Sequence, residues 1–118
     1  MNRFEGKIVA IQTHEPFSQV TADLGGGVSL QATVIDTPET AGYLVEGGPV
    51  SVHFKETEVI LCLPGMPGIS EPNLIPGKLT AIENGALLTW VGLQTGIGSL
   101  GAVIPSEAVK QLHLQPGQ

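Results

Sequence analysis

The feature that most constrains this chain is an internal repeat. Residues 2–11 (NRFEGKIVAI) lie over residues 73–82 (NLIPGKLTAI), with Asn, Gly, Lys, Ala and Ile coinciding at one constant offset. Two later pairs of segments also match, each with a small insertion or deletion: 29–32 with 99–102, and 45–48 with 114–117. Identities that recur in order over a whole unit indicate an internal duplication, so the chain is predicted to contain two copies of one small fold.

The apolar runs are short, rich in Val and Ile, and interrupted by turn residues, since 16 of the 118 residues are Gly and nine are Pro. This pattern is typical of strands rather than long helices. The three glycines at 25–27 predict a tight hairpin turn. One short helix is expected to begin at Asp36 or Thr37, with Pro38 in its first turn. The first copy has five predicted strands, at 7–11, 18–24, 28–35, 50–54 and 59–63.

The repeat divides the chain into a first module at 1–63, a linker at 64–69 and a second module at 70–118. The linker is expected because its sequence begins PGMPG, which continues neither a helix nor a sheet. In this register Gly117 corresponds to Gly48, so the second copy has no counterpart of the last two strands of the first. A barrel without two strands has open edges, so either the sequence is truncated or another chain supplies the missing strands.

Composition and charge exclude several classes of function. Acidic residues outnumber basic residues 11 to 5, for a net charge of −6, so the basic surface that binds duplex DNA is not expected. Single-stranded nucleic acid is also disfavoured, because three Phe, one Trp and one Tyr are few aromatic rings for base stacking. No signal peptide is visible, and no segment approaches the ~18–20 apolar residues that span a bilayer, so membrane insertion is not expected.

No catalytic arrangement is visible in the sequence. Cys62, the single cysteine, lies within the apolar run ILCL and is expected to be a buried, inert thiol. The three histidines, His14, His53 and His113, lack the spacing of metal ligands. The glycines at 25–27 lack the Lys-Ser/Thr pair of a phosphate-binding loop. The chain is therefore predicted not to be an enzyme.

Small neutral hydrogen-bond donors gather instead at the starts of several segments. The stretch SEPN at 70–73 precedes the second copy, NGA at 84–86 follows its first strand, and Lys55 and Thr57 lie between the last two strands of the first copy. Concave runs of backbone N–H groups bind anions, and small residues let a ligand approach them. The net charge does not forbid such a site, because ~0.15 M salt screens charges beyond ~8 Å. The alternatives are an ordinary surface lysine at Lys55 and a plain linker at 70–73.

Taken in order, these motifs resemble the small molybdate-binding modules called Mop or TOBE domains. SEPN at 70–73 corresponds to the family's opening Ser-Ala-Arg-Asn-like motif, and GALL at 85–88 to its Gly-Ala-Val-Asn-like turn. LHLQPG at 112–117 resembles the family's Leu-Gly-Leu-x-x-Gly segment. In the first copy, KETEVIL at 55–61 resembles the Lys-Ala-Ser-x-Val-Ile-Leu signature. Such modules occur in molbindins, in molybdate-responsive regulators and in the ATPase subunit of molybdate importers.

The resemblance implies an all-β fold of tandem OB-fold-like five-stranded barrels, each with one short helix, the second barrel lacking its last strands. It also implies a homo-oligomer, a dimer or trimer with exchanged strands, in which molybdate or tungstate binds between modules. The family's oxyanion ligands carry over to six residues: Ser70, Asn73, Gly85, Ala86, Lys55 and Thr57. The sequence departs from the family at Pro72, which replaces its Arg, at Glu71, which replaces its Ala, and at Leu88, which replaces an Asn.

These degenerate motifs favour one setting for the protein. They predict a regulatory, oxyanion-binding domain in the ATP-binding subunit of a molybdate importer, cytoplasmic and peripheral to the inner membrane, with the transporter's membrane subunits as partners. Two alternatives stay open. One is a free molbindin-type storage protein, and the other is a structural or oligomerisation appendage that has lost anion binding.

Overall fold

The computed structural model describes residues 1–63 and 73–118, so the predicted linker at 64–69 and the candidate ligand Ser70 lie outside the described residues. The elements of the first copy are β1 (Asn2–His14), β2 (Phe17–Gly25), β3 (Val28–Val34), β4 (Pro49–Phe54) and the 3-10 helix η1 (Glu56–Glu58). Those of the second copy are β5 (Gly77–Glu83), β6 (Leu88–Thr95), β7 (Gly98–Pro105) and α1 (Ser106–Gln111). None of the described helices has the length and apolar character needed to cross a membrane.

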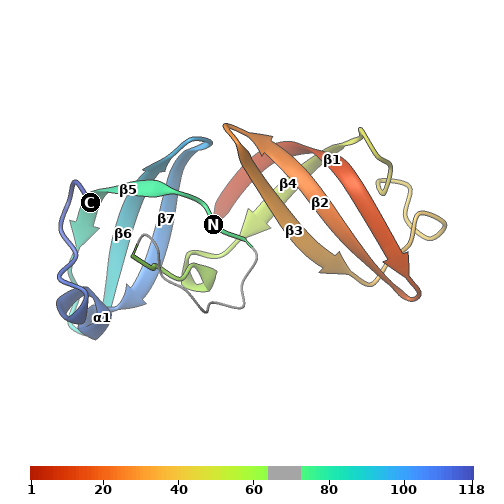
Figure 1. Cartoon of the computed structure of the whole chain (residues 1–118). Coiled ribbons are helices and arrows are strands. Elements are labelled where there is room, and N and C mark those ends of the chain that lie inside the picture. Colours follow the sequence, from red (N-terminus) through yellow and green to blue (C-terminus); the bar gives the residue numbers. More distant parts are fainter. Residues whose placement is uncertain (64–72) are drawn as a thin grey trace. The chain divides into compact units, whose positions relative to one another are not determined.

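The strands form two sheets, one of order β3-β2-β1-β4 and one of order β5-β6-β7 (Figure 1). The predicted all-β class is confirmed, but within the described residues the sheets are open and do not close into five-stranded barrels. The expected fifth strand at 59–63 is irregular, because these residues pair with no neighbouring strand in the described part of the chain.

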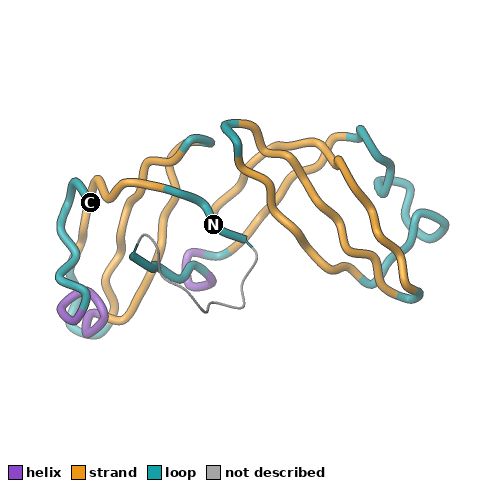
Figure 2. The backbone as a smooth tube through the Cα atoms, in the orientation of Figure 1, coloured by secondary structure: helices purple, strands orange, loops and turns teal. Residues whose placement is uncertain are grey.

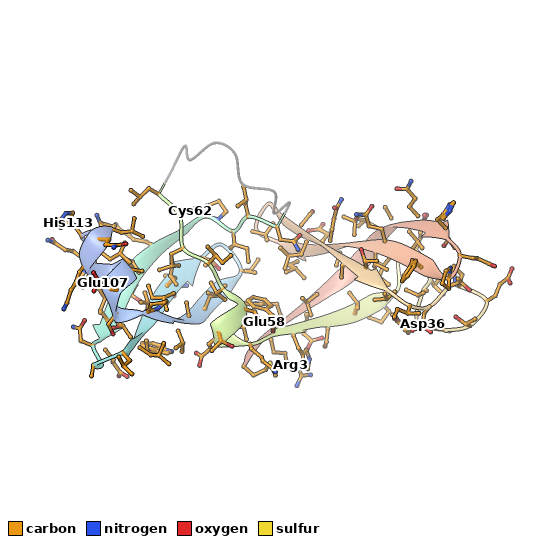
Figure 3. The ribbon with its side chains drawn as sticks, turned by 90° about the horizontal axis from the view of Figure 1, so that it is seen from below. Arg3, Asp36, Glu58, Cys62, Glu107 and His113 are labelled. Atoms are coloured by element: carbon orange, nitrogen blue, oxygen red, sulfur yellow. The ribbon has the colours of Figure 1, made fainter. Side chains whose placement is uncertain are left out.

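The segment at 59–63 nevertheless alternates like a strand. Val59 and Leu61 pack against a hydrophobic core, whereas Ile60 is exposed. Cys62 is also exposed, so the prediction of a buried thiol was wrong (Figure 3). The alternation explains the error, since every second side chain of this apolar run faces solvent.

The two copies pair their strands in the same way, as the duplication in the sequence predicts. The first hairpin of each copy, β1–β2 and β5–β6, has the same register, including a bulge directly after Ile8 and after Leu79. In the second hairpin, Gly26 and Gly27 form a two-residue turn with φ of 57° and 78°, as the glycine run predicts. A further bulge in β2, before Gly25, accounts for the one-residue shift between the copies.

Backbone hydrogen bonds at the end of each copy correct the sequence alignment by one residue. The N–H of Ile8 donates to the Gly48 oxygen at 2.9 Å, and the Gly47 N–H donates to the Ile8 oxygen at 2.7 Å. Leu79 is bonded in the same way to Gln118 and Gly117, at 2.7 Å in both cases. Gly117 therefore corresponds to Gly47 and not to Gly48, because this position requires the positive φ that both residues have, 98° and 84°.

The short helix expected at Asp36 or Thr37 is reduced to a single turn. The Thr37 oxygen accepts hydrogen bonds from the N–H groups of Thr40 and Ala41, each at 2.9 Å. The Thr40 hydroxyl also accepts from the Thr37 N–H at 2.7 Å. The same hydroxyl donates to the Thr37 oxygen at 3.1 Å, so it competes for a carbonyl group that a longer helix would use, and the turn closes on itself. The equivalent segment of the second copy forms α1.

The described residues fall into two compact units, and both cross the boundary of the repeat. The first, here called the four-stranded unit, contains residues 3–52 and 73–74; the three-stranded unit contains residues 1–2, 53–63 and 75–118. The core of the four-stranded unit is Ile8, Val20 and Leu44. The core of the three-stranded unit is Leu79, Val91, Ala102, Ile104 and Val109. Each copy thus contributes a short segment to the unit built mainly from the other. Figure 2 shows that the described chain consists mainly of strands and loops, with little helix.

Candidate oxyanion site

Strand β7 is an edge strand, and an edge strand presents backbone N–H and C=O groups without a strand partner. Asn2 supplies that partner in the three-stranded unit. Its Oδ1 accepts from the Gly101 N–H at 2.9 Å, and its Nδ2 donates to the Gly101 oxygen at 2.9 Å. Asn2 is buried, so its side-chain amide takes the place of a missing strand residue.

The candidate ligand Asn73 makes the same pair of bonds in the four-stranded unit. Its Oδ1 accepts from the Gln31 N–H at 2.7 Å, and its Nδ2 donates to the Gln31 oxygen at 2.8 Å. Gln31 lies in the edge strand β3, at the position that the repeat equates with Gly101. Asn2 and Asn73 are themselves equivalent, so the first Asn of each copy pairs with the edge strand of the other. The sequence signal for this pairing was that Asn2 and Asn73 occupy the same position in the two copies.

Lys55 and Thr57 lie at η1, which contacts β7 in the three-stranded unit (Figure 1). Glu58 holds the turn locally, because its carboxylate accepts from the Lys55 N–H at 2.7 Å and its own N–H donates to the Lys55 oxygen at 2.9 Å. Glu56 holds the turn to the sheet, because its Oε2 accepts from the Trp90 Nε1–H at 2.9 Å. Lys55 and Thr57 are exposed, and their side chains make no hydrogen bond or ion pair with the described residues.

Gly85 and Ala86 lie in the loop between β5 and β6, and this loop is held against the start of α1. The Gly85 oxygen accepts from the Ser106 hydroxyl at 2.8 Å, and that hydroxyl is also 2.8 Å from the Thr89 hydroxyl. A Cβ at Gly85 would collide with the Leu88 carbonyl oxygen, so the loop requires glycine there. Ser106 and Thr89 are buried, and the sequence did not single them out as supports of this loop.

The structure describes five of the six candidate ligands. Lys55, Thr57, Gly85 and Ala86 belong to the three-stranded unit, whereas Asn73 belongs to the four-stranded unit. Within the three-stranded unit, no described hydrogen bond joins the turn at η1 to the loop between β5 and β6. The assembly of these residues around one anion therefore stays a prediction.

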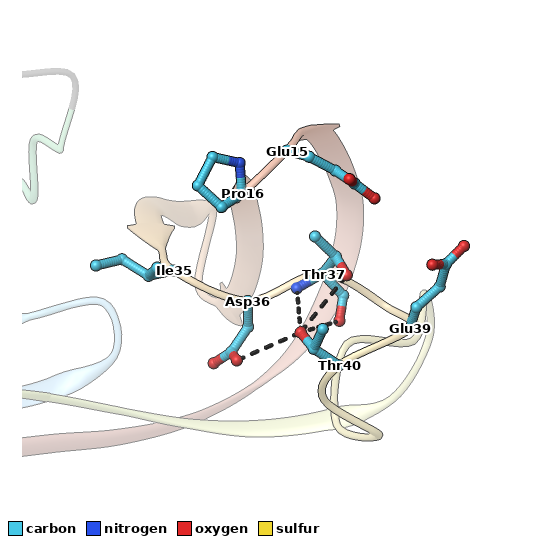
Figure 4. A pocket seen from close by; sticks show the side chains of 7 residues that line it. All are labelled: Glu15, Pro16, Ile35, Asp36, Thr37, Glu39 and Thr40. Atoms are coloured by element: carbon cyan, nitrogen blue, oxygen red, sulfur yellow. Dashed lines mark hydrogen bonds between the residues drawn. The ribbon is translucent and has the colours of Figure 1, made fainter.

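A pocket of about 390 Å³ in the four-stranded unit has the wrong charge for an oxyanion (Figure 4). Three carboxylates line it, together with the hydrogen-bonded hydroxyls of Thr37 and Thr40. Its lining residues are Glu15, Pro16, Ile35, Asp36, Thr37, Glu39 and Thr40. Among the residues that the structure describes, no group of three or more His, Cys, Asp or Glu side chains is placed to hold a metal ion.

The fold and the site together define a class of protein: a duplicated small β domain whose copies exchange segments and whose exposed polar groups suit ligand binding rather than catalysis. The TOBE domain model matches residues 1–61 and again residues 69–118, and the chain belongs to the TOBE domain family. This confirms the resemblance found in the sequence. TOBE domains are binding domains and not enzymes.

Among solved structures, the chain is similar to ModG, described as a cytoplasmic molybdate-binding protein and solved with molybdate bound. The match has a TM-score of 0.86 and 28% sequence identity, and it covers 98% of this chain and 84% of the ModG chain. No curated protein matches the sequence.

Proposed function

We propose that this protein binds molybdate or tungstate through its two TOBE modules. The observation that carries the proposal is the match of nearly the whole chain to ModG, which was solved with molybdate bound. The structure adds a chemical reason. The Lys55 ammonium and the Thr57 hydroxyl are exposed and unpaired within the described residues, so both are available as donors to a tetrahedral dianion.

The carboxylates beside these donors are the main electrostatic obstacle. Two like unit charges 4 Å apart repel by about 4 kcal/mol at the effective dielectric constant of ~20 near a protein surface. Both neighbouring carboxylates are engaged elsewhere: Glu56 accepts from the indole of Trp90, and Glu58 accepts from the Lys55 backbone. These bonds hold the two negative groups in place and leave the Lys55 ammonium free to meet the anion.

Calorimetric titration with molybdate, tungstate, sulfate and phosphate tests the proposal. We expect molybdate or tungstate to bind at micromolar concentration, and Lys55→Ala to weaken binding by about tenfold or more, since a hydrogen bond to a charged group contributes ~1.5–3 kcal/mol. Lys110→Ala is the matched control, because Lys110 is another exposed lysine of the same unit. The absence of binding by the wild-type protein would contradict the proposal and favour a purely structural appendage.

We also propose that the protein is a homo-oligomer, a dimer or trimer. Large apolar side chains of the three-stranded unit are exposed, including Ile60 at 80%, Leu87 at 83% and Leu88 at 58%. Both sheets also have open edges in the described residues. Within one chain, each copy contributes a short segment to the unit built mainly from the other. The exchange of strands between chains stays a prediction. Light scattering coupled to size exclusion measures the mass, and a monomer at all concentrations would contradict the proposal.

The cellular setting is a separate question with two candidates. We favour a free cytoplasmic molybdate-binding protein, because the match covers 84% of the ModG chain, which is itself described as cytoplasmic. The regulatory domain of an importer ATPase is the second candidate, supported by the departures from the family at Glu71, Pro72 and Leu88. Affinity purification from the native cell distinguishes them, since only the second predicts recovery of the importer's membrane subunits.

A further inference from the structure

The only tryptophan of the chain ties the turn at η1 to the sheet beneath it. Trp90 lies on β6, and its Nε1–H donates to the Glu56 Oε2 at 2.9 Å. A hydrogen bond to a carboxylate is charge-assisted and is stronger than one between neutral groups. Both side chains are half-buried, which limits competition from water.

Gly101 on the neighbouring strand makes this contact possible. A Cβ at Gly101 would collide with the Glu56 carboxylate and would lie 3.0 Å from the Trp90 Nε1. Because Gly101 has no side chain, the sheet leaves space for the Glu56 carboxylate, and the Trp90 Nε1–H donates to the carboxylate there. The same Gly101 is bonded through its backbone to Asn2, which holds β7 in position.

The contact decides where the neighbours of Glu56 lie. Glu56 stands between Lys55 and Thr57 in the sequence. Lys55 precedes η1 in extended backbone, with φ of −76° and ψ of 150°, and successive side chains of extended backbone point to opposite sides. Thr57 follows Glu56 within η1, where successive side chains point about 120° apart. When Glu56 is bonded to the sheet, its two neighbours must point away from that sheet, and both are exposed in the structure.

We propose that Trp90 is a positioning residue for the oxyanion site. By donating to Glu56, it fixes the turn that carries Lys55 and Thr57 and holds the Glu56 charge on the sheet, away from the anion. Trp90 itself does not touch the anion. This inference rests on the proposed function, since it assigns a role within the same site.

The experiment compares two variants of Glu56 that have the same charge. Glu56→Gln keeps an oxygen that accepts from the indole, whereas Glu56→Ala removes it. By calorimetry we expect Glu56→Ala to bind molybdate about fivefold more weakly than Glu56→Gln, at the lower end of typical coupling between sites. We expect Trp90→Phe to weaken molybdate binding by a similar factor. In the Trp90→Phe background the difference between the two Glu56 variants should disappear, because the donor is gone.

Controls separate positioning from general destabilisation. Thr80→Val removes a different side-chain bond of the same unit, from the Thr80 hydroxyl to the Gly92 oxygen at 3.2 Å. It should lower the thermal midpoint and leave the molybdate affinity unchanged. Two results overturn the positioning role and leave the proposed function intact. One is an unchanged molybdate affinity in Trp90→Phe. The other is a difference in affinity between Glu56→Gln and Glu56→Ala that persists in the Trp90→Phe background.

Two further outcomes are also decisive. If Trp90→Phe does not fold, the positioning role is tested by comparing Glu56→Gln with Glu56→Ala in the otherwise wild-type protein. Equal molybdate affinities of these two variants overturn the positioning role. If the wild-type protein binds neither molybdate nor tungstate, the proposed function fails, and the positioning role fails with it.

Discussion

Replacing Asn2 with Ala is expected to lower the free energy of unfolding of the three-stranded unit by about 2–4 kcal/mol. The Asn2 side chain makes two bonds of 2.9 Å to the Gly101 backbone, and Asn2 is only 7% exposed. The substitution leaves one N–H and one C=O without their partner, and each unpaired buried group costs ~1–3 kcal/mol. Water entering the gap left by the amide offsets part of this cost, which keeps the expected loss below the sum.

Urea denaturation followed by Trp90 fluorescence measures this loss, because the single tryptophan lies in the same unit as Asn2. Asn73→Ala is the matched control. It removes the equivalent pair of bonds to Gln31, which is exposed, so the loss of these two bonds should cost about 1 kcal/mol or less. Circular dichroism follows that change in the four-stranded unit. The reasoning that burial sets the cost is refuted if the unfolding midpoint of Asn2→Ala lies at the same urea concentration as that of the wild-type protein.

Three other substitutions or reactions test the structure. Gly85→Ala should lower stability by about 1–3 kcal/mol, because the new methyl group meets the Leu88 carbonyl oxygen; an unchanged thermal midpoint would argue against this loop geometry. Leu79→Ala should cost about 2–5 kcal/mol in the unfolding transition reported by Trp90, and a loss below 1 kcal/mol would argue against a packed core at this position. Cys62 should react with a thiol reagent without denaturant, since it is exposed, and a reaction that requires urea would show that the thiol is buried.

The strands were largely readable from the sequence because their determinants are local. Alternating apolar residues predicted β2 and β3, and the glycines between them predicted the turn that joins them. The errors occurred where a side chain competes with the backbone or where pairing depends on distant residues. The Thr40 hydroxyl closed a turn in place of a helix, and the run ending at Cys62 found no strand to pair with among the described residues.

The candidate site was readable only in part, for a similar reason. Lys55 and Thr57 could be named from their motif, but nothing local marks Trp90 as the partner of Glu56, 34 positions away. The role of Gly101 was hidden as well, since a glycine in a strand gives no sign of which side chain approaches it. Such contacts depend on how the strands lie together, and this is settled only when the chain folds.

The sequence by itself determined three things: the repeat showed two copies, the short apolar runs broken by Gly and Pro indicated an all-β class, and the motifs in their order indicated the TOBE family. Only the tertiary structure decided which copy each segment completes. Asn2 bonds to Gly101 of the second copy, and Asn73 bonds to Gln31 of the first. The physical reason lies in the edge strands, whose unpaired N–H and C=O groups need a partner. Both copies begin with an equivalent Asn, so the sequence offers the same partner twice, and the folded geometry decides which edge strand each Asn pairs with.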